Sequence, residues 1–179
     1  MNSLDQSMQI KSPEDAALVS IGGENEIMVS KSILSFHSPF FRALFDGDFV
    51  ERETETYTLN GVNYLGFLHF LALVYNMNVI VDAETVGYLL HLGDMYSCDI
   101  VIRRCHDFLL KPSSSSSLAH MERLQLAEQY NFYDVSKATI DELPRTEAFH
   151  LSEHFVMVKD EFIRQLLNKC LTDWAVNPE

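Results

Sequence analysis

Two short runs of β-favouring residues lie near the start of the chain, at 17–21 and 26–29. Most positions in each run are apolar, and the turn-forming residues Gly22-Gly23-Glu24-Asn25 separate them. Because glycine adopts positive φ angles at little steric cost, this arrangement predicts a β-hairpin. Threonines alternate with apolar residues at 54–59, which is the period of a third strand, and a short fourth strand is expected at 77–81.

Other hydrophobic positions recur at helical spacing. Ser30 can cap a first helix, and Ser38-Pro39 is a favourable start for a second. Residues 61–75 are apolar nearly all round, which predicts a central, buried helix. Two further helices are expected to begin at Asp82 and Asp99, since aspartate is a common N-cap residue.

A run of five serines, 113–117, divides the chain because it is too polar and flexible to pack. We therefore expect four parts, which are a polar N-terminal segment at 1–13, a core domain at 14–111, a linker at 112–117 and a helical extension at 118–179. The extension has three helical patterns, and the last of them includes Phe155, Val158 and Phe162. The order of strands and helices predicts an α+β fold, not a doubly wound sheet.

The chain is acidic, with 13 lysines and arginines against 26 aspartates and glutamates, for a net charge of -13. This charge argues against nucleic-acid and anionic-membrane partners and favours a neutral or basic protein. Residues 61–81 contain no charged side chain, but Asn63 and His69 favour a buried helix over a membrane span. The N-terminus lacks a signal-peptide pattern, and three cysteines without a CxxC pair indicate a reducing compartment, the cytosol or the nucleus.

Motifs for binding dinucleotides or phosphates and for serine hydrolysis are absent from the sequence. One catalytic pattern does occur, H-x-x-E-H at His150, Glu153 and His154, which is typical of a zinc hydrolase. No third zinc ligand stands at a supporting spacing, so we interpret the pattern as the start of an amphipathic helix and keep the hydrolase as an alternative. We therefore expect no catalytic residues, no cofactor and no bound metal.

Taken in order, these elements resemble a BTB (POZ) domain over residues 14–111. The resemblance is carried by Asp15-Ala16-Ala17-Leu18-Val19-Ser20-Ile21, by the block from Ile27-Met28-Val29-Ser30 to Arg42-Ala43-Leu44-Phe45, and by residues 67–75, 89–96 and 105–109. It implies a helical cluster capped by a short β-sheet. The tail resembles, more weakly, the small all-helical (BACK-like) extension that follows this domain in many members.

The resemblance also implies a function, because family members are interaction modules that commonly dimerise. Many bind cullin-3 and bring protein substrates to a ubiquitin ligase. The implied cullin-binding residues are Phe49, Val50 and Glu51, in a hydrophobic-x-Glu motif after the second helix, and Tyr96 between the last two helices.

The implied dimer interface includes Ile33 and Phe36 on the first helix, for which core packing is the alternative role. Phe49 could likewise pack on its own domain. We expect a dimeric cullin-3 adaptor for an unidentified substrate, acting in the cytoplasm or nucleus. The alternative is a dimerisation scaffold, or a regulator that forms BTB heterodimers, without ligase function.

Overall fold

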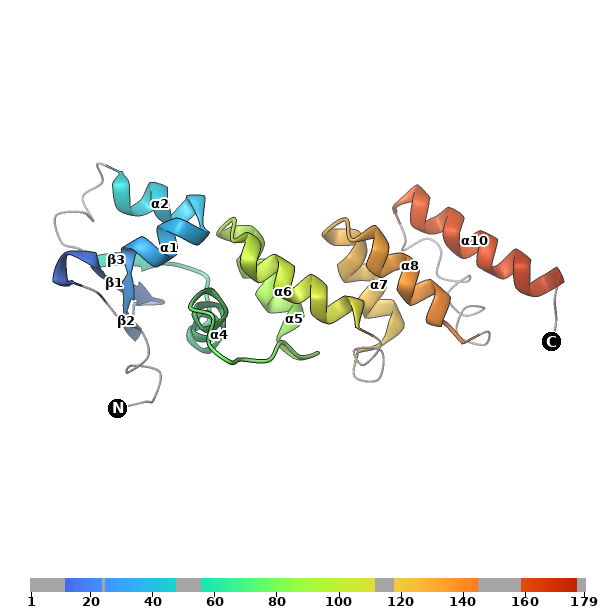
Figure 1. Ribbon diagram of the computed structural model, residues 1–179, viewed down its shortest axis with the longest axis horizontal. Helices are drawn as coiled ribbons and strands as arrows, with labels where there is room; N and C mark the ends of the chain where they lie inside the picture. Colours follow the sequence, from blue (N-terminus) through green and yellow to red (C-terminus); the bar gives the residue numbers. More distant parts are fainter. Residues whose placement is uncertain (1–11, 24, 48–55, 112–117, 145–158, 177–179) are drawn as a thin grey trace. The chain divides into compact units, whose positions relative to one another are not determined.

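The computed structural model describes residues 12–23, 25–47, 56–111, 118–144 and 159–176 (Figure 1). The chain forms two compact units, Met1–Cys105 and His106–Glu179. Strands and helices combine in the first unit, and the expected α+β class is confirmed. The division between the units falls within helix α6 (Asp99–Leu110), whereas the expected linker at 112–117 lies outside the described residues. The domain bounds expected from the sequence therefore stay a prediction.

The sheet of the first unit has three strands in the order β2-β1-β3. Strand β1 (Ala16–Ile21) pairs antiparallel with β2 (Asn25–Ser30) and parallel with β3 (Thr56–Leu59). Gly22 and Gly23 join the first two strands with φ angles of 63° and 78°, which glycine adopts without strain. The predicted hairpin and third strand are confirmed.

The prediction of a strand at 77–81 is wrong, because these residues form irregular structure after the end of a helix. Asn76 has a left-handed φ of 53°, and the Met77 backbone N donates back to the Ala72 carbonyl at 2.8 Å. The Val79 N then donates to the Met77 carbonyl at 2.7 Å, in a local turn. A strand needs a neighbouring strand edge, and the described sheet places none beside this segment.

The first two helices begin at the caps expected from the sequence. Helix α1 (Lys31–His37) has Ser30 as its N-cap, whose Oγ accepts a hydrogen bond from the Ile33 backbone N at 3.2 Å. Helix α2 (Pro39–Asp46) is capped in the same way by Ser38. Within the first unit, α1 packs against α2 and β2, so the caps also set how α1 meets the sheet (Figure 1).

The next two caps differ from the expectation by a few residues. Helix α5 (Val86–Met95) has Thr85 as its N-cap residue, and the Asp82 carboxylate accepts from the Thr85 backbone N at 2.9 Å in the preceding turn. Helix α6 already includes Asp99, and the carbonyl of Cys98 accepts from the Val101 N at 3.1 Å. Each aspartate stands near a helix start, but the backbone turns at a neighbouring residue.

The centre of the first unit is helix α4 (Tyr64–Val74), the buried helix expected at 61–75. Six of its residues are buried, including Phe67 and Phe70, whose rings stack with centroids 5.7 Å apart. We call the six buried rings that meet around this helix the aromatic core, which consists of Phe41, Phe45, Tyr57, Phe67, Phe70 and Tyr96. Among the described helices, none is both long and apolar enough to cross a bilayer.

In its described part, the second unit contains α7 (His120–Gln129), α8 (Tyr133–Glu142) and α10 (Glu161–Val176). These helices confirm the helical patterns of the tail, although Phe155 and Val158 lie outside the described residues. Their shared core is formed by Leu124, Ile140, Leu143, Ile163 and Leu167.

A fully buried arginine ties together the start of this unit. Arg123 of α7 donates from Nε to the Leu109 carbonyl at 2.7 Å and from Nη1 to Glu142 Oε2 at 2.6 Å. The Leu109 carbonyl belongs to the last turn of α6, where backbone acceptors have no partner within the helix. Arg123 therefore satisfies the end of one helix while pairing with a carboxylate on another.

Candidate protein-interaction surface

Hydrogen bonds from three parts of the first unit hold the start of α1. Asp15 ends the 3-10 turn Pro13–Asp15, and its carboxylate accepts from the Ser32 backbone N at 2.8 Å and from Ser30 Oγ at 2.5 Å. The Ser30 backbone N donates to the Tyr75 hydroxyl at 2.7 Å. The first turn of α1 is therefore fixed by groups outside the helix, so its exposed face has a defined position.

This network predicts acid sensitivity. Burial acts to raise the pKa of Asp15, but the hydrogen bonds from Ser30 and Ser32 outweigh it and hold the pKa below its ordinary value of 3.8. A lowered pKa in the folded state stabilises the protein above pH 3.8, and this contribution is lost as the pH falls through the folded-state value. Urea unfolding should therefore show wild type losing its advantage over Asp15→Asn below pH 3.8. A constant difference between the two proteins across that range would contradict the prediction.

The exposed face of α1 carries a large aromatic side chain. Phe36 is 77% exposed and contacts His37 edge to face, while Leu34 is the buried residue of the helix and Ile33 is half-buried. Burying a phenylalanine is ordinarily worth about 1.5–3 kcal/mol, which Phe36 does not gain within the described chain. Core packing therefore buries part of the Ile33 side chain but does not bury that of Phe36. The Phe36 ring is available to a partner.

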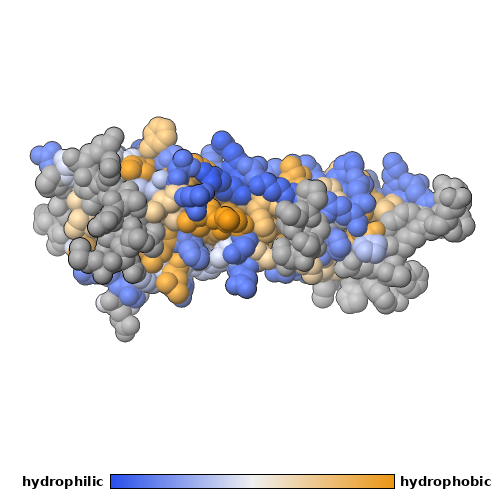
Figure 2. Space-filling model, turned by 60° about the horizontal axis from the view of Figure 1, so that its bottom comes forward, coloured by the Kyte–Doolittle hydropathy of each residue, from blue (hydrophilic) through white to orange (hydrophobic). Residues whose placement is uncertain are grey.

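A second exposed apolar side chain, Met28 on β2, is not among the residues expected from the sequence. It is 52% exposed, between the buried residues Ile27 and Val29. Strict alternation along β2 is the signal that could have found it, since Met28 has the outward parity. Figure 2 shows a face of the molecule on which hydrophobic side chains reach the surface among polar ones.

Tyr96 does not occupy the exposed position that a docking anchor requires. Its side chain is 2% exposed, and its ring lies 4.9 Å from Phe41 and 5.5 Å from Phe70, centroid to centroid. Ser38 Oγ donates to the Tyr96 carbonyl at 2.5 Å, which joins the cap of α2 to the end of α5. Burial in the aromatic core therefore accounts for the placement of this ring, and the cullin-binding role expected for Tyr96 stays a prediction.

The family model of the BTB/POZ domain matches residues 4–113. The chain belongs to the BTB/POZ family. It is therefore a protein-interaction module, and the α+β fold described above is consistent with this family.

Relatives of this BTB/POZ chain occur in nematodes and vertebrates. It is 30% identical to BTB and MATH domain-containing protein 38 of Caenorhabditis elegans over 151 residues, which are 83% of this chain and 38% of the relative. BTB and MATH domain-containing protein 15 of the same organism is 30% identical over 126 residues, 70% of this chain and 45% of the relative. Human Kelch-like protein 15 is 27% identical over 101 residues, 56% of this chain and 17% of the relative. The chain thus spans less than half the length of these relatives.

Two motifs singled out in the sequence lie outside the described residues. Phe49-Val50-Glu51 follows α2, whose C-cap Gly47 is the last described residue before it. His150, Glu153 and His154 lie between α8 and α10, again outside the described part. The roles expected for both motifs stay predictions.

The two cysteines of the first unit, Cys98 and Cys105, are unsuited to act as nucleophiles. Cys98 and Cys105 are fully buried, and burial raises the pKa of Cys98 to about 11 and that of Cys105 to about 12. Both thiols are therefore protonated at neutral pH, whereas nucleophilic attack needs the thiolate. Among the described residues, no cluster of histidine, cysteine and carboxylate side chains could hold a metal ion.

Proposed function

We propose that this BTB/POZ chain is a dimeric adaptor that links a protein substrate to a cullin-3 ubiquitin ligase in the cytosol or nucleus. The observation that carries the proposal is the position of Phe49-Val50-Glu51. It directly follows α2 within a match to the family model, where the resemblance implies a cullin-binding motif. Phe49 would enter an apolar slot on a cullin helix, and Glu51 would hold the local loop or meet a cation.

A second candidate function is self-association without a role in a ubiquitin ligase, as a scaffold or as a regulator that forms heterodimers with other BTB chains. The exposure of Phe36 on the face of α1 favours it, because this side chain is available to a partner whether or not the chain binds a cullin. Ile33 and Phe36 are the proposed dimer contacts in both candidates. The two functions differ in what happens at Phe49.

Substituting Phe36 by serine is expected to weaken dimerisation while leaving the fold intact. An aromatic anchor at the centre of an interface is typically worth about 2 kcal/mol or more, which is roughly a 30-fold change in the dimer dissociation constant. Sedimentation equilibrium over a concentration series measures this change, and circular dichroism checks the fold. An unchanged dimer in Phe36→Ser would place the interface elsewhere.

Substituting Phe49 by alanine is expected to weaken cullin-3 binding by at least about tenfold, or about 1.4 kcal/mol. Calorimetric titration of the full chain against the cullin-3 amino-terminal domain measures the affinity. Ile80→Ala, which shortens an exposed apolar side chain outside the candidate interaction surface, is the matched control and should bind like wild type.

Three outcomes separate the candidate functions. Binding by wild type that Phe49→Ala weakens supports the adaptor and its anchor together. No binding by a folded, dimeric wild type removes the adaptor and leaves the scaffold. Equal binding by wild type and Phe49→Ala would retain the adaptor but reject Phe49 as its anchor.

A further inference from the structure

Two exposed aromatic rings stand at one end of the seam between α8 and α10 in the second unit. Tyr133 begins α8 and Phe162 lies in the first turn of α10, and their rings meet edge to face with centroids 5.3 Å apart. They are 45% and 47% exposed. Because each ring restrains the other, the pair presents apolar surface that is already ordered.

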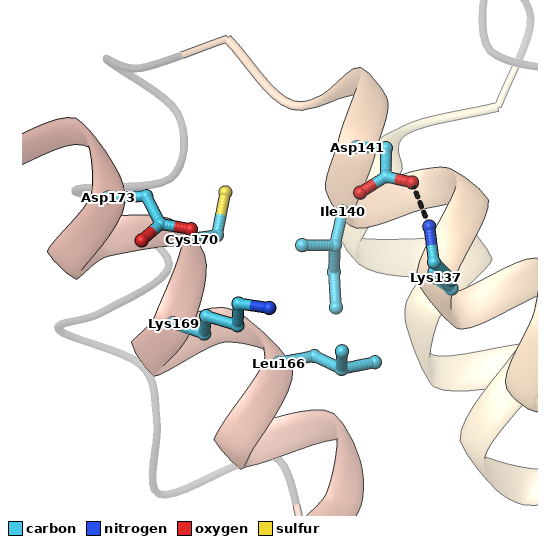
Figure 3. A pocket seen from close by; sticks show the side chains of 7 residues that line it. All are labelled: Lys137, Ile140, Asp141, Leu166, Lys169, Cys170 and Asp173. Carbon is cyan, nitrogen blue, oxygen red and sulfur yellow. Dashed lines mark hydrogen bonds and ion pairs between the residues drawn. The ribbon is translucent and has the colours of Figure 1, made fainter. Parts of the chain in front are cut away.

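The same two helices enclose a groove of about 240 Å³ farther along the seam (Figure 3). Its floor is apolar, with Ile140 from α8 and Leu166 and Cys170 from α10. Ile140 belongs to the core of the second unit, and Leu166 and Cys170 pack against that core. The floor is therefore supported from below, so the groove exists before any ligand binds.

Charged side chains line both walls of this groove. On α8, Lys137 Nζ lies 2.6 Å from Asp141 Oδ2, so these two charges partly neutralise each other. On α10, Lys169 and Asp173 stand one turn apart, and within the described part of the chain neither of them forms an ion pair. Figure 3 shows the Lys169 side chain extending over the floor toward α8, with Asp173 beside Cys170.

The two aspartates lie at the same end of the groove. Burial is the largest cause that raises the pKa of the Cys170 thiol, and the charges of Asp141 and Asp173 raise it further. Both carboxylates therefore act on this thiol from opposite walls. The thiol stays neutral at physiological pH, so it extends the apolar floor and does not serve as a nucleophile.

We propose that the α8–α10 seam docks a short segment of a partner protein in which apolar side chains stand next to an arginine or lysine. Such a segment would lay apolar groups on Tyr133, Phe162 and the groove floor. Its cation would lie between Asp141 and Asp173, with the aliphatic stem on the floor. From Tyr133 to Asp141, α8 rises about 12 Å, which a helical segment of about eight residues matches.

The net charge of the chain favours a cationic partner segment over an anionic one. Asp173 and Lys169 both lack an ion pair among the described residues, so a partner cation can pair with Asp173 without breaking an existing interaction, as an anion can with Lys169. The net charge of -13 draws basic segments toward the chain and repels acidic ones. Lys169 repels a cation from the middle of the groove, and this repulsion sets the position of the segment along it.

The test uses the full chain and two capped probe peptides. One is acetyl-Ala-Leu-Ala-Ala-Leu-Arg-Ala-amide, and the other has glutamate in place of arginine. Amide chemical shifts of the isotope-labelled protein are followed as each peptide is added up to millimolar concentration. Asp173→Asn removes the proposed partner of the cation, and Glu122→Gln removes an exposed charge of α7 outside the groove as the matched control.

We expect saturable shifts in α8 and α10 with the arginine peptide and affinity about two- to fivefold weaker for the glutamate peptide. Asp173→Asn should lower the affinity for the arginine peptide by a similar factor, and Glu122→Gln should not. Equal affinity for both peptides, an unchanged affinity in Asp173→Asn, or no saturable shift in these helices would overturn the proposal. These readouts do not involve cullin-3, so failure of the adaptor function would leave them unaffected.

Discussion

Replacing Arg123 by alanine is expected to destabilise the second unit by about 2–5 kcal/mol, because it truncates a fully buried side chain and removes a buried hydrogen-bond donor. The substitution removes the Nε donor to the Leu109 carbonyl and the guanidinium that pairs with Glu142, and it opens space in the core. Arg123→Lys is expected to be destabilising as well. A lysine keeps the charge but lacks the Nε–H that reaches Leu109 alongside the contact to Glu142.

Hydrogen exchange measured by mass spectrometry reports the loss of stability separately for the first and the second unit. Amides of α7 and α8 should exchange faster in Arg123→Ala, while those of α4 in the first unit should change much less. Lys137→Met is the matched control, because it also breaks an ion pair of this unit, the exposed contact to Asp141. Exposed pairs contribute about 0–1 kcal/mol, so the control should resemble wild type. Equal protection in Arg123→Ala and Lys137→Met would show that burial of the arginine adds nothing.

Truncating Phe41 to alanine should destabilise the first unit by about 3–5 kcal/mol, as is usual for a phenylalanine in a packed core. Phe41 is fully buried in the aromatic core. Its ring lies 4.9 Å from that of Tyr96 and 5.9 Å from that of Phe45, centroid to centroid. Loss of this ring would leave a cavity among rigid neighbours, which cannot relax to fill it.

Urea unfolding measures the free energy of unfolding of Phe41→Ala. A second phenylalanine of the same chain provides the control. Phe36, on the helix just before α2, undergoes the same chemical change in Phe36→Ala but is largely exposed. Measured where both proteins are monomeric, Phe36→Ala should stay within about 0.5 kcal/mol of wild type. Similar losses in the two variants would mean that Phe36 is buried in solution.

Local rules accounted for the elements whose structure depends on nearby residues. The hairpin follows from Gly22 and Gly23, and the starts of α1 and α2 follow from Ser30 and Ser38, because each cap bonds within its own turn. The buried helix α4 follows from a stretch that is apolar on all sides. These features need no knowledge of distant contacts.

Features that depend on tertiary contacts were harder to predict. Residues 77–81 have strand-like composition, but a strand forms only beside another strand edge. The resemblance implied a cullin-binding role for Tyr96, but it did not show that the ring packs among Phe41, Phe67 and Phe70. A sequence pattern does not show which aromatic side chains fill the same core.

The candidate interaction surface was predicted in part. The resemblance pointed to Phe36, which the structure leaves exposed, but not to Met28, which the alternation of side chains along β2 could have indicated. The pairing of Tyr133 with Phe162 joins residues 29 positions apart in sequence, across two helices whose packing no local pattern reveals. Residue type alone predicts a surface position for Arg123, because arginine is seldom buried.

The placement of the three thiols makes the native chain suitable for selective labelling. Cys98 and Cys105 are buried, whereas Cys170 is partly accessible at the α8–α10 groove. The raised pKa keeps this thiol neutral at physiological pH, so a maleimide dye would attach at Cys170 only at an alkaline pH at which the thiolate forms. Because the dye is held by a stable covalent bond at the groove, it would block the groove irreversibly and provide a control for competition assays.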